Sequence, residues 1–239
     1  MATVAPAFET APSTIVPRRV TSTIWLAVGV AVLGTAGTIA GPPFITDPGV
    51  FADGPEAVFA ELTGGHIPSQ VGAALLYATA VCLLLLRPRL VEMLRRAAPA
   101  AEELVDRIGT TLDVAVATVT IGAVFKSILT SGLPGAVDAD FYTQVDVAVL
   151  FTVSGQLQYG VFVPLVATMA LTAVLVFRHG GLPRWVGALS ALLAFAVCAV
   201  TMALNLPWSA GLVTPVWMIA MAFTAWRGGR QELVVPDAR

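Results

Sequence analysis

The sequence predicts an all-α, polytopic membrane protein, a bundle of six transmembrane helices with its N- and C-termini in the cytoplasm. Of the 239 residues, 57% are hydrophobic and only 12% are charged, against about 25% charged residues in a typical soluble domain. The apolar residues lie in long stretches, which excludes a disordered chain and an ordinary soluble domain. The formal net charge is −2 and no basic face is available, so nucleic acid is not expected as a partner.

Six apolar stretches are long enough, or nearly long enough, to cross a bilayer as helices. A helix rises about 1.5 Å per residue, so a hydrocarbon core of about 30 Å requires roughly 20 residues. The predicted spans are residues 21–40, 69–86, 108–129, 157–177, 185–204 and 209–226. They form one transmembrane domain, residues 18–230, between a disordered N-terminal tail, 1–17, and a C-terminal tail, 231–239.

A short helix is predicted over residues 54–63, in the first outer loop. Asp53 and Glu56 have the spacing of a capping box at its start. Gly64 can adopt the left-handed conformation that ends a helix. This helix is expected to lie on the bundle mouth or the membrane surface, or to act as a lid over an outward cavity.

Two further segments lie between the predicted spans. In the large inner loop, 87–107, apolar residues recur at helical spacing over 90–97, which predicts a short amphipathic helix on the inner membrane surface. The apolar run 141–153 is too short to cross. It predicts an interfacial helix or an extension of the fourth span, with a break at Ser154-Gly155.

The arginines set the orientation. Cytoplasmic loops of membrane proteins are enriched in Lys and Arg. Segments 41–68, 130–156 and 205–208 hold no arginine, whereas the alternate segments hold all of them: Arg18, Arg19, Arg87, Arg89, Arg95, Arg96, Arg107, Arg178, Arg184, Arg227, Arg230 and Arg239. This alternation predicts a multi-pass protein of the cell (inner) membrane with both termini inside.

Ionisable residues inside spans are functional candidates, because a charge is costly there. Two occur, Asp113 and Lys126, both in the third span, and Lys126 is the only lysine in the chain. They lie about 20 Å apart along the helix and roughly 140° apart around it, so they cannot pair with each other. Each can also be a boundary residue that extends to water. The expected counter-charge of Lys126 is Asp146.

The functional interpretation places Lys126 at the floor of an outward-facing polar pocket. The residues expected there are His66, Gln70, Lys126, Asp146, Gln156, Gln158 and Tyr159. No catalytic residue is identified. The two histidines lie on opposite sides of the membrane, and the two cysteines lie in separate spans, so neither a metal nor a cofactor is expected.

Small residues predict a close helix contact at the outer end of the first span. Gly37 and Gly41 form a GxxxG motif, which lets two helices approach closely. Packing within the chain is one use of this motif, and a homodimer through Gly37 and Gly41 is the alternative. Besides the lipid bilayer, a cytoplasmic partner at loop 87–107 is one interpretation of its arginines, and simple anchoring of the topology is the alternative.

Three short pieces of the chain carry a resemblance. Residues 176–187 contain a basic turn with Pro183-Arg184-Trp185, residues 53–72 join the outer-loop helix to Gln70-Val71-Gly72, and the last span closes on residues 226–229. This layout resembles small bacterial multi-pass integral membrane proteins of unknown function. The resemblance implies a six-helix bundle and no catalytic residues.

Two classes of function follow from these observations. The first is a non-enzymatic integral membrane protein, namely a small transporter, a sensor or a membrane partner of another protein. The alternative is a membrane-embedded enzyme that acts on a lipid or isoprenoid in an outward-facing pocket near Lys126. The enzyme requires Lys126 to be accessible to a substrate, so its surroundings distinguish the two classes.

Overall fold

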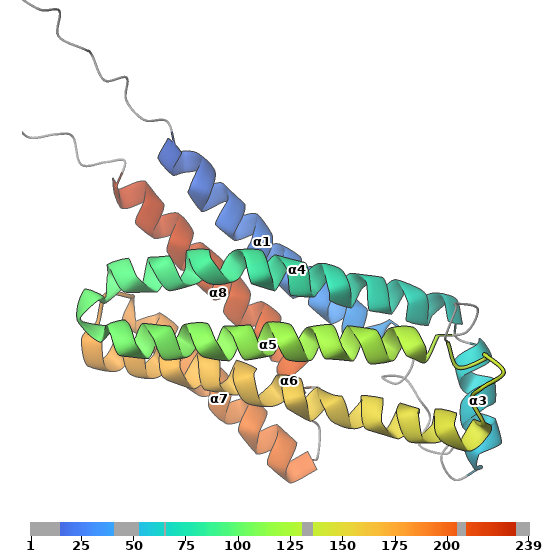
Figure 1. The fold of residues 1–239 in the computed structure, drawn as a ribbon. Helices are drawn as coiled ribbons and strands as arrows, with labels where there is room; N and C mark the ends of the chain where they lie inside the picture. Colours follow the sequence, from blue (N-terminus) through green and yellow to red (C-terminus); the bar gives the residue numbers. More distant parts are fainter. Residues whose placement is uncertain (1–14, 41–52, 65, 131–135, 205–208, 233–239) are drawn as a thin grey trace, which may run out of the picture.

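The computed structural model describes residues 15–40, 53–64, 66–130, 136–204 and 209–232 (Figure 1). Every regular element in these ranges is a helix: α1 Ile15–Ile39, α3 Pro55–Gly64, α4 His66–Ala97, the 3₁₀ turn η1 Pro99–Ala101, α5 Glu102–Ile128, α6 Gln144–His179, α7 Arg184–Leu204 and α8 Ser209–Glu232. Five of them, α1, α4, α5 (with η1), α6 and α7, are long and apolar enough to cross a membrane. The prediction of a helical membrane bundle is confirmed. Of the predicted N-terminal tail, 15–17 belong to α1, and 1–14 lie outside the described residues.

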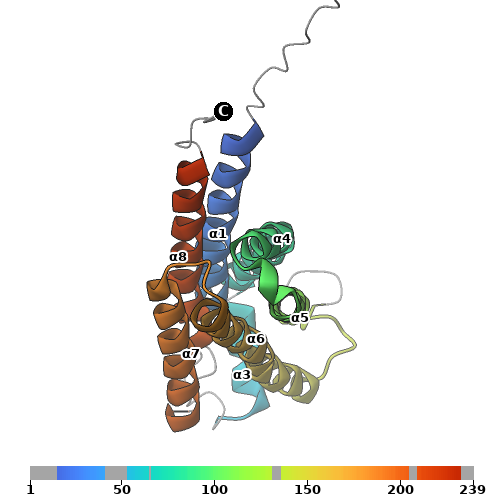
Figure 2. The same cartoon turned by 90° about the vertical axis from the view of Figure 1, so that its left-hand side faces the viewer.

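The long helices pack in chain order around a common core. Each of α1, α4, α5, α6, α7 and α8 contacts the next, and α8 returns to α1. In Figure 1, α4, α5 and α6 run side by side, while α1, α7 and α8 cross them obliquely. Figure 2 looks nearly along the axes of α4 and α5 and shows α1, α7 and α8 from the side. Every one of the six contributes to the core, for example through Ala31, Leu86, Leu112, Met169, Ala194 and Trp217.

Helix α4 does not end at the second predicted span but continues through Pro88 to Ala97. The separate surface helix predicted over 90–97 is therefore wrong. Its apolar residues, Leu90 and Leu94, are buried in the bundle core on the same face as Leu86. Packing along this face offsets the helix-breaking tendency of proline. At 32 residues, α4 is about 48 Å long and exceeds the thickness of the hydrocarbon core.

Helix α6 is also longer than predicted. Segment 141–153 is in part an extension of the fourth span, but the expected break at Ser154-Gly155 does not occur. Val147, Phe151 and Ser154 are buried at spacings of four and three residues, so one helical face remains packed through the glycine. A single glycine costs a helix only about 1 kcal/mol, which this packing outweighs.

The short helix predicted over 54–63 is confirmed as α3. Its Val58 and Leu62 are buried, and they pack with Val147 and Phe151 of α6 in a small cluster of their own. In Figure 1, α3 lies across the right-hand end of the bundle, beside the start of α6. The helix therefore covers the bundle mouth at this end.

The close contact expected at Gly37 lies within the chain. A Cβ atom at Gly37 would meet the Leu76 backbone nitrogen at 3.0 Å and the Gly72 carbonyl oxygen at 3.1 Å, so α1 and α4 are nearly in backbone contact. A dimer through this face would have to displace α4, and Gly41 lies outside the described residues. Ala27, which lies earlier in α1 than Gly37, is also buried, so it does not face lipid.

We expect Gly37→Leu to destabilise the protein by about 1–3 kcal/mol, because a larger side chain pushes two packed backbones apart. The measurement is the thermal unfolding midpoint in detergent. Val32→Leu is the matched control, since Val32 lies on the same helix and its side chain is 60% exposed. Equal midpoints for Gly37→Leu and wild type would contradict the close α1–α4 contact.

Candidate functional site

Lys126 is buried rather than exposed to an outward cavity. It lies in the last turn of α5 and is only 4% exposed. Its Nζ atom donates a hydrogen bond of 2.9 Å to the carbonyl oxygen of Gly37, in the last turn of α1. The only lysine of the chain therefore connects two helices that are not neighbours in the ring.

The position of Lys126 at two helix ends explains how its charge is accommodated. The last carbonyls of a helix lack partners within the helix, and the aligned peptide dipoles give that end a partial negative charge. The ammonium lies in the final turn of α5 and bonds to the final turn of α1. Two helix ends thus provide the negative potential that a carboxylate was expected to provide.

Gly72 of α4 provides the space for this contact. A Cβ atom at Gly72 would lie 2.6 Å from Lys126 Cε, 2.8 Å from Nζ and 2.5 Å from the carbonyl oxygen of Ala40. Real Cβ atoms do not approach other atoms so closely, so a side chain at this position would displace either the lysine or α1. The lysine, Gly37 and Gly72 form one three-helix contact, which we call the lysine clamp.

The expected pairing of Lys126 with Asp146 is wrong. Asp146 is exposed in the first turn of α6 and accepts hydrogen bonds from the Thr143 hydroxyl, at 2.6 Å, and the Thr143 backbone N–H, at 3.0 Å. The Asp146 N–H donates in turn to the Thr143 hydroxyl oxygen, at 3.3 Å, and with the bond from the Thr143 N–H this completes a capping box. The carboxylate is needed at the N-terminus of α6, where a negative charge stabilises the helix, and both ionised groups have other partners.

The other residues of the predicted outer pocket are only partly described. Gln70 is half-buried on α4 and Gln156 is exposed on α6. The side chains of His66, Gln158 and Tyr159 lie outside the described residues. The outer pocket stays a prediction.

Asp113 is paired instead of standing alone in the membrane. Its carboxylate accepts a hydrogen bond of 2.8 Å from Arg87 of α4, and both side chains are partly exposed. A second cross-helix pair joins Arg95 to Asp106 at 2.6 Å. These pairs link α4 and α5 along their charged ends. We call residues 87–107 the α4–α5 hairpin. Asp113 lies on α5 just beyond it and helps to align its two helices.

The turn between α6 and α7 supports the end of this hairpin. Gly180 and Gly181 have φ angles of 71° and 79°, a left-handed conformation that glycine adopts without strain. A Cβ atom at Gly181 would collide with the carbonyl group of Ala97, the last residue of α4. The two glycines therefore let the turn lie directly against the end of α4.

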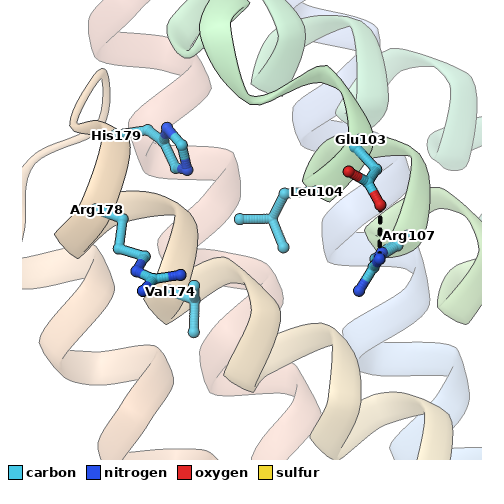
Figure 3. Close-up of a pocket in the computed structure, with 6 residues that line it drawn as sticks. All are labelled: Glu103, Leu104, Arg107, Val174, Arg178 and His179. Atoms are coloured by element: carbon cyan, nitrogen blue, oxygen red, sulfur yellow. Dashed lines mark hydrogen bonds and ion pairs between the residues drawn. The ribbon is translucent and has the colours of Figure 1, made fainter.

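A small open pocket lies between α5 and α6 at this same end of the bundle (Figure 3). Its volume is about 180 Å³, and it is lined by Glu103, Leu104, Arg107, Val174, Arg178 and His179. In Figure 3 Leu104 lies between the side chains of Arg178 and Arg107. Glu103 accepts a hydrogen bond of 2.6 Å from Arg107, as their i,i+4 spacing predicts. We call this pocket the α5–α6 notch.

The sequence singled out Lys126 and Gly37 of the clamp, but it did not show that they contact each other. Gly72 lies in the outer part of the second span, as Gly37 does in the first, so two small residues at the depth of an intramembrane lysine were the available signal. For the notch there was no comparable signal, because Arg107 and Arg178 belong to different loops. In the described part of the chain, no three His, Cys, Asp or Glu side chains could hold a metal ion together.

Comparison with family models, with curated proteins and with solved structures returns no match for this chain.

The lysine clamp predicts energetic coupling between Gly72 and Lys126. Gly72→Ala should destabilise the protein strongly, because the new methyl group overlaps the lysine side chain. In a Lys126→Ala background the same change should cost less, with a remaining cost from the Ala40 carbonyl. A double-mutant cycle of unfolding free energies in detergent measures this difference. Equal costs in the two backgrounds would contradict the clamp.

In a second double-mutant cycle, we expect no coupling energy between Lys126 and Asp146. Asp146→Ala should cost about 1 kcal/mol through loss of the helix cap. Its effect should add to that of Lys126→Ala within roughly 0.5 kcal/mol, as for independent sites. A clear coupling energy between these two changes would restore the ion pair that the sequence suggested.

Proposed function

We propose that this chain is a non-enzymatic integral membrane protein of the inner membrane that acts as a membrane partner of another protein. The partner is engaged in the cytoplasm by the α4–α5 hairpin, residues 87–107. The observation that carries this proposal is that the helices do not stop at the predicted membrane boundary. Helix α4 continues to Ala97, and α5 begins at Glu102, so the segment that was expected to hold a separate surface helix is instead formed by the packed ends of two long helices.

The hairpin has the features of a preformed binding element. Its inner face is apolar and buried, with Leu94 and Val105 each 0% exposed. Its outer face is charged and exposed, with both signs present: Arg89, Glu92, Arg95, Arg96, Glu102, Glu103, Asp106 and Arg107. Because the helices are already ordered, binding through this face loses little conformational entropy. Mixed charges favour specificity over general attraction to an anionic surface.

The arrangement of the helix ends supports the proposed orientation. In Figure 1 the start of α1, the α4–α5 junction, the α6–α7 turn and the end of α8 all lie toward the left. These are the segments that carry the arginines, so one end of the bundle is basic. The basic end of a membrane protein faces the cytoplasm.

Helix α8 supports a sixth crossing. Its residues Leu212, Val216, Ile219 and Phe223 are exposed at spacings of four, three and four, which places them on one helical face. The buried face of α8 contains Trp217, whose Nε1 donates a hydrogen bond of 3.0 Å to Ser190 of α7. An apolar exposed stripe opposite a packed face is expected of a helix between protein and lipid.

The competing functions receive less support from the geometry. A membrane enzyme at Lys126 needs an accessible amine, but this amine is buried and bonded to Gly37. Transporters commonly use helices that are interrupted near the membrane midplane. Helices α4 and α6 instead continue through Pro88 and Pro164. No separate observation favours a sensor over a partner protein.

The proposed orientation predicts which positions a thiol reagent can label from outside the cell. In a variant lacking Cys82 and Cys198, an impermeant thiol reagent added to intact cells should label Asp53→Cys but not Arg95→Cys. Both positions are exposed, so folding should not hide either one. Labelling at Arg95→Cys with none at Asp53→Cys would reverse the orientation.

The partner proposal predicts a specific photocrosslink. A photoreactive amino acid at the exposed Arg96 should form a discrete protein adduct in the native cell. The same group at Val163, whose side chain is 62% exposed on α6 and faces the predicted lipid region, should not form that adduct. If Arg89, Glu92 and Arg96 all fail to give an adduct distinct from Val163, the hairpin is not a docking site.

A further inference from the structure

The α5–α6 notch brings cationic side chains from two helices to one opening. Arg107 comes from the second turn of α5, and Arg178 and His179 form the end of α6. Within the described part of the chain, the side chains of Arg178 and His179 form no hydrogen bond or ion pair. The notch therefore presents a free guanidinium and an imidazole beside a second guanidinium.

The only acid in the notch leaves donors available. One carboxylate oxygen of Glu103 accepts a hydrogen bond from the NH2 group of Arg107. A guanidinium has five N–H donors, so Arg107 retains donors for a second acceptor. With one carboxylate against two guanidiniums, the notch keeps a net positive charge. Planar guanidinium groups bind phosphate oxygens in a bidentate manner, so a phosphate group matches this site.

The notch opens onto an apolar surface that runs toward the middle of the bundle. On α5, Val114 and Ile121 follow Arg107 at intervals of seven residues, and both are exposed. On α6, Val174 lines the notch and Val163 lies eleven residues before it, both exposed. These intervals keep each set on one helical face. Two apolar stripes therefore lead away from the basic notch.

We propose that the α5–α6 notch binds the phosphate of an anionic lipid headgroup in the cytoplasmic leaflet. Arg107 and Arg178 bind the phosphate oxygens, His179 adds a third donor, and an acyl chain lies along the stripes of Val114 and Val163. Basic pockets between transmembrane helices on the cytoplasmic side suit such headgroups. The leaflet assignment rests on the proposed orientation, whereas the binding site does not.

The apolar stripes select a lipid over free phosphate as the ligand. The pocket volume of about 180 Å³ far exceeds the roughly 10–15 Å³ that admits one water molecule. Inorganic phosphate would use only the charged rim, where water screens the attraction. A lipid phosphate is held at the rim by its own acyl chains, which adds apolar contact to the ionic contact.

The test is native mass spectrometry of the purified full chain in detergent, titrated with phosphatidylglycerol or phosphatidylcholine. We expect the wild type to bind one phosphatidylglycerol about 10-fold more tightly than phosphatidylcholine, and Arg178→Gln to lose most of this preference, since hydrogen bonds to charged groups have this strength. Arg89→Gln is the matched control, because Arg89 is an exposed arginine of the same end outside the notch. Its affinity should equal that of the wild type.

Three outcomes would overturn the proposal. Equal losses in Arg178→Gln and Arg89→Gln would show general attraction to the basic end, and equal binding of the two lipids would remove headgroup recognition. Displacement of the lipid by millimolar inorganic phosphate would identify a free-phosphate site. Since binding is measured outside the membrane, it stands or falls independently of the cysteine labelling. Reversed labelling with intact lipid binding would reject the cytoplasmic leaflet alone.

Discussion

The hydrogen bond from Lys126 to the Gly37 carbonyl is the contact on which the packing of α1, α4 and α5 at one end of the bundle depends. It connects α5 to α1, which are separated in the ring by α4. For the bond to form, α4 must pass between them without a side chain at Gly72, and α1 must approach α4 without a side chain at Gly37. The lysine contact therefore requires glycine at both positions, because a buried charge must be bonded where water is scarce.

The opposite end of the bundle is stabilised by buried apolar residues beneath exposed ion pairs. There the charges are exposed or half-exposed, and ion pairs such as Arg87–Asp113 and Arg95–Asp106 have partners on neighbouring helices. Exposed pairs contribute little stability individually, so the buried residues beneath them, including Leu94 and Val105, provide most of it. The exposed charged groups are the ones through which we propose contacts with a protein partner and with lipid headgroups.

The sequence predicted the helical membrane bundle and the short helix over 54–63, because these depend on local composition and spacing. It failed where packing between distant segments outweighed a local signal. The second span was predicted to end at residue 86, and a break was predicted at Ser154-Gly155, yet buried helix faces continue through both positions. The partner of Lys126 was sought among carboxylates, whereas the bond is made by a backbone carbonyl, which carries no sequence signal. The notch likewise depends on which faces of α5 and α6 meet.

The most direct test of this account is a distance measurement on the lysine side chain in the membrane. Because Lys126 is the only lysine, ¹⁵N labelling of lysine Nζ gives one signal, and ¹³C labelling of glycine carbonyls supplies the partner. Solid-state NMR dipolar recoupling should report an Nζ-to-carbonyl-carbon distance of about 4 Å, and the coupling should weaken in Gly37→Ala, which removes the labelled carbonyl. An uncoupled lysine signal in the wild type, or one unchanged by Gly37→Ala, would contradict the clamp.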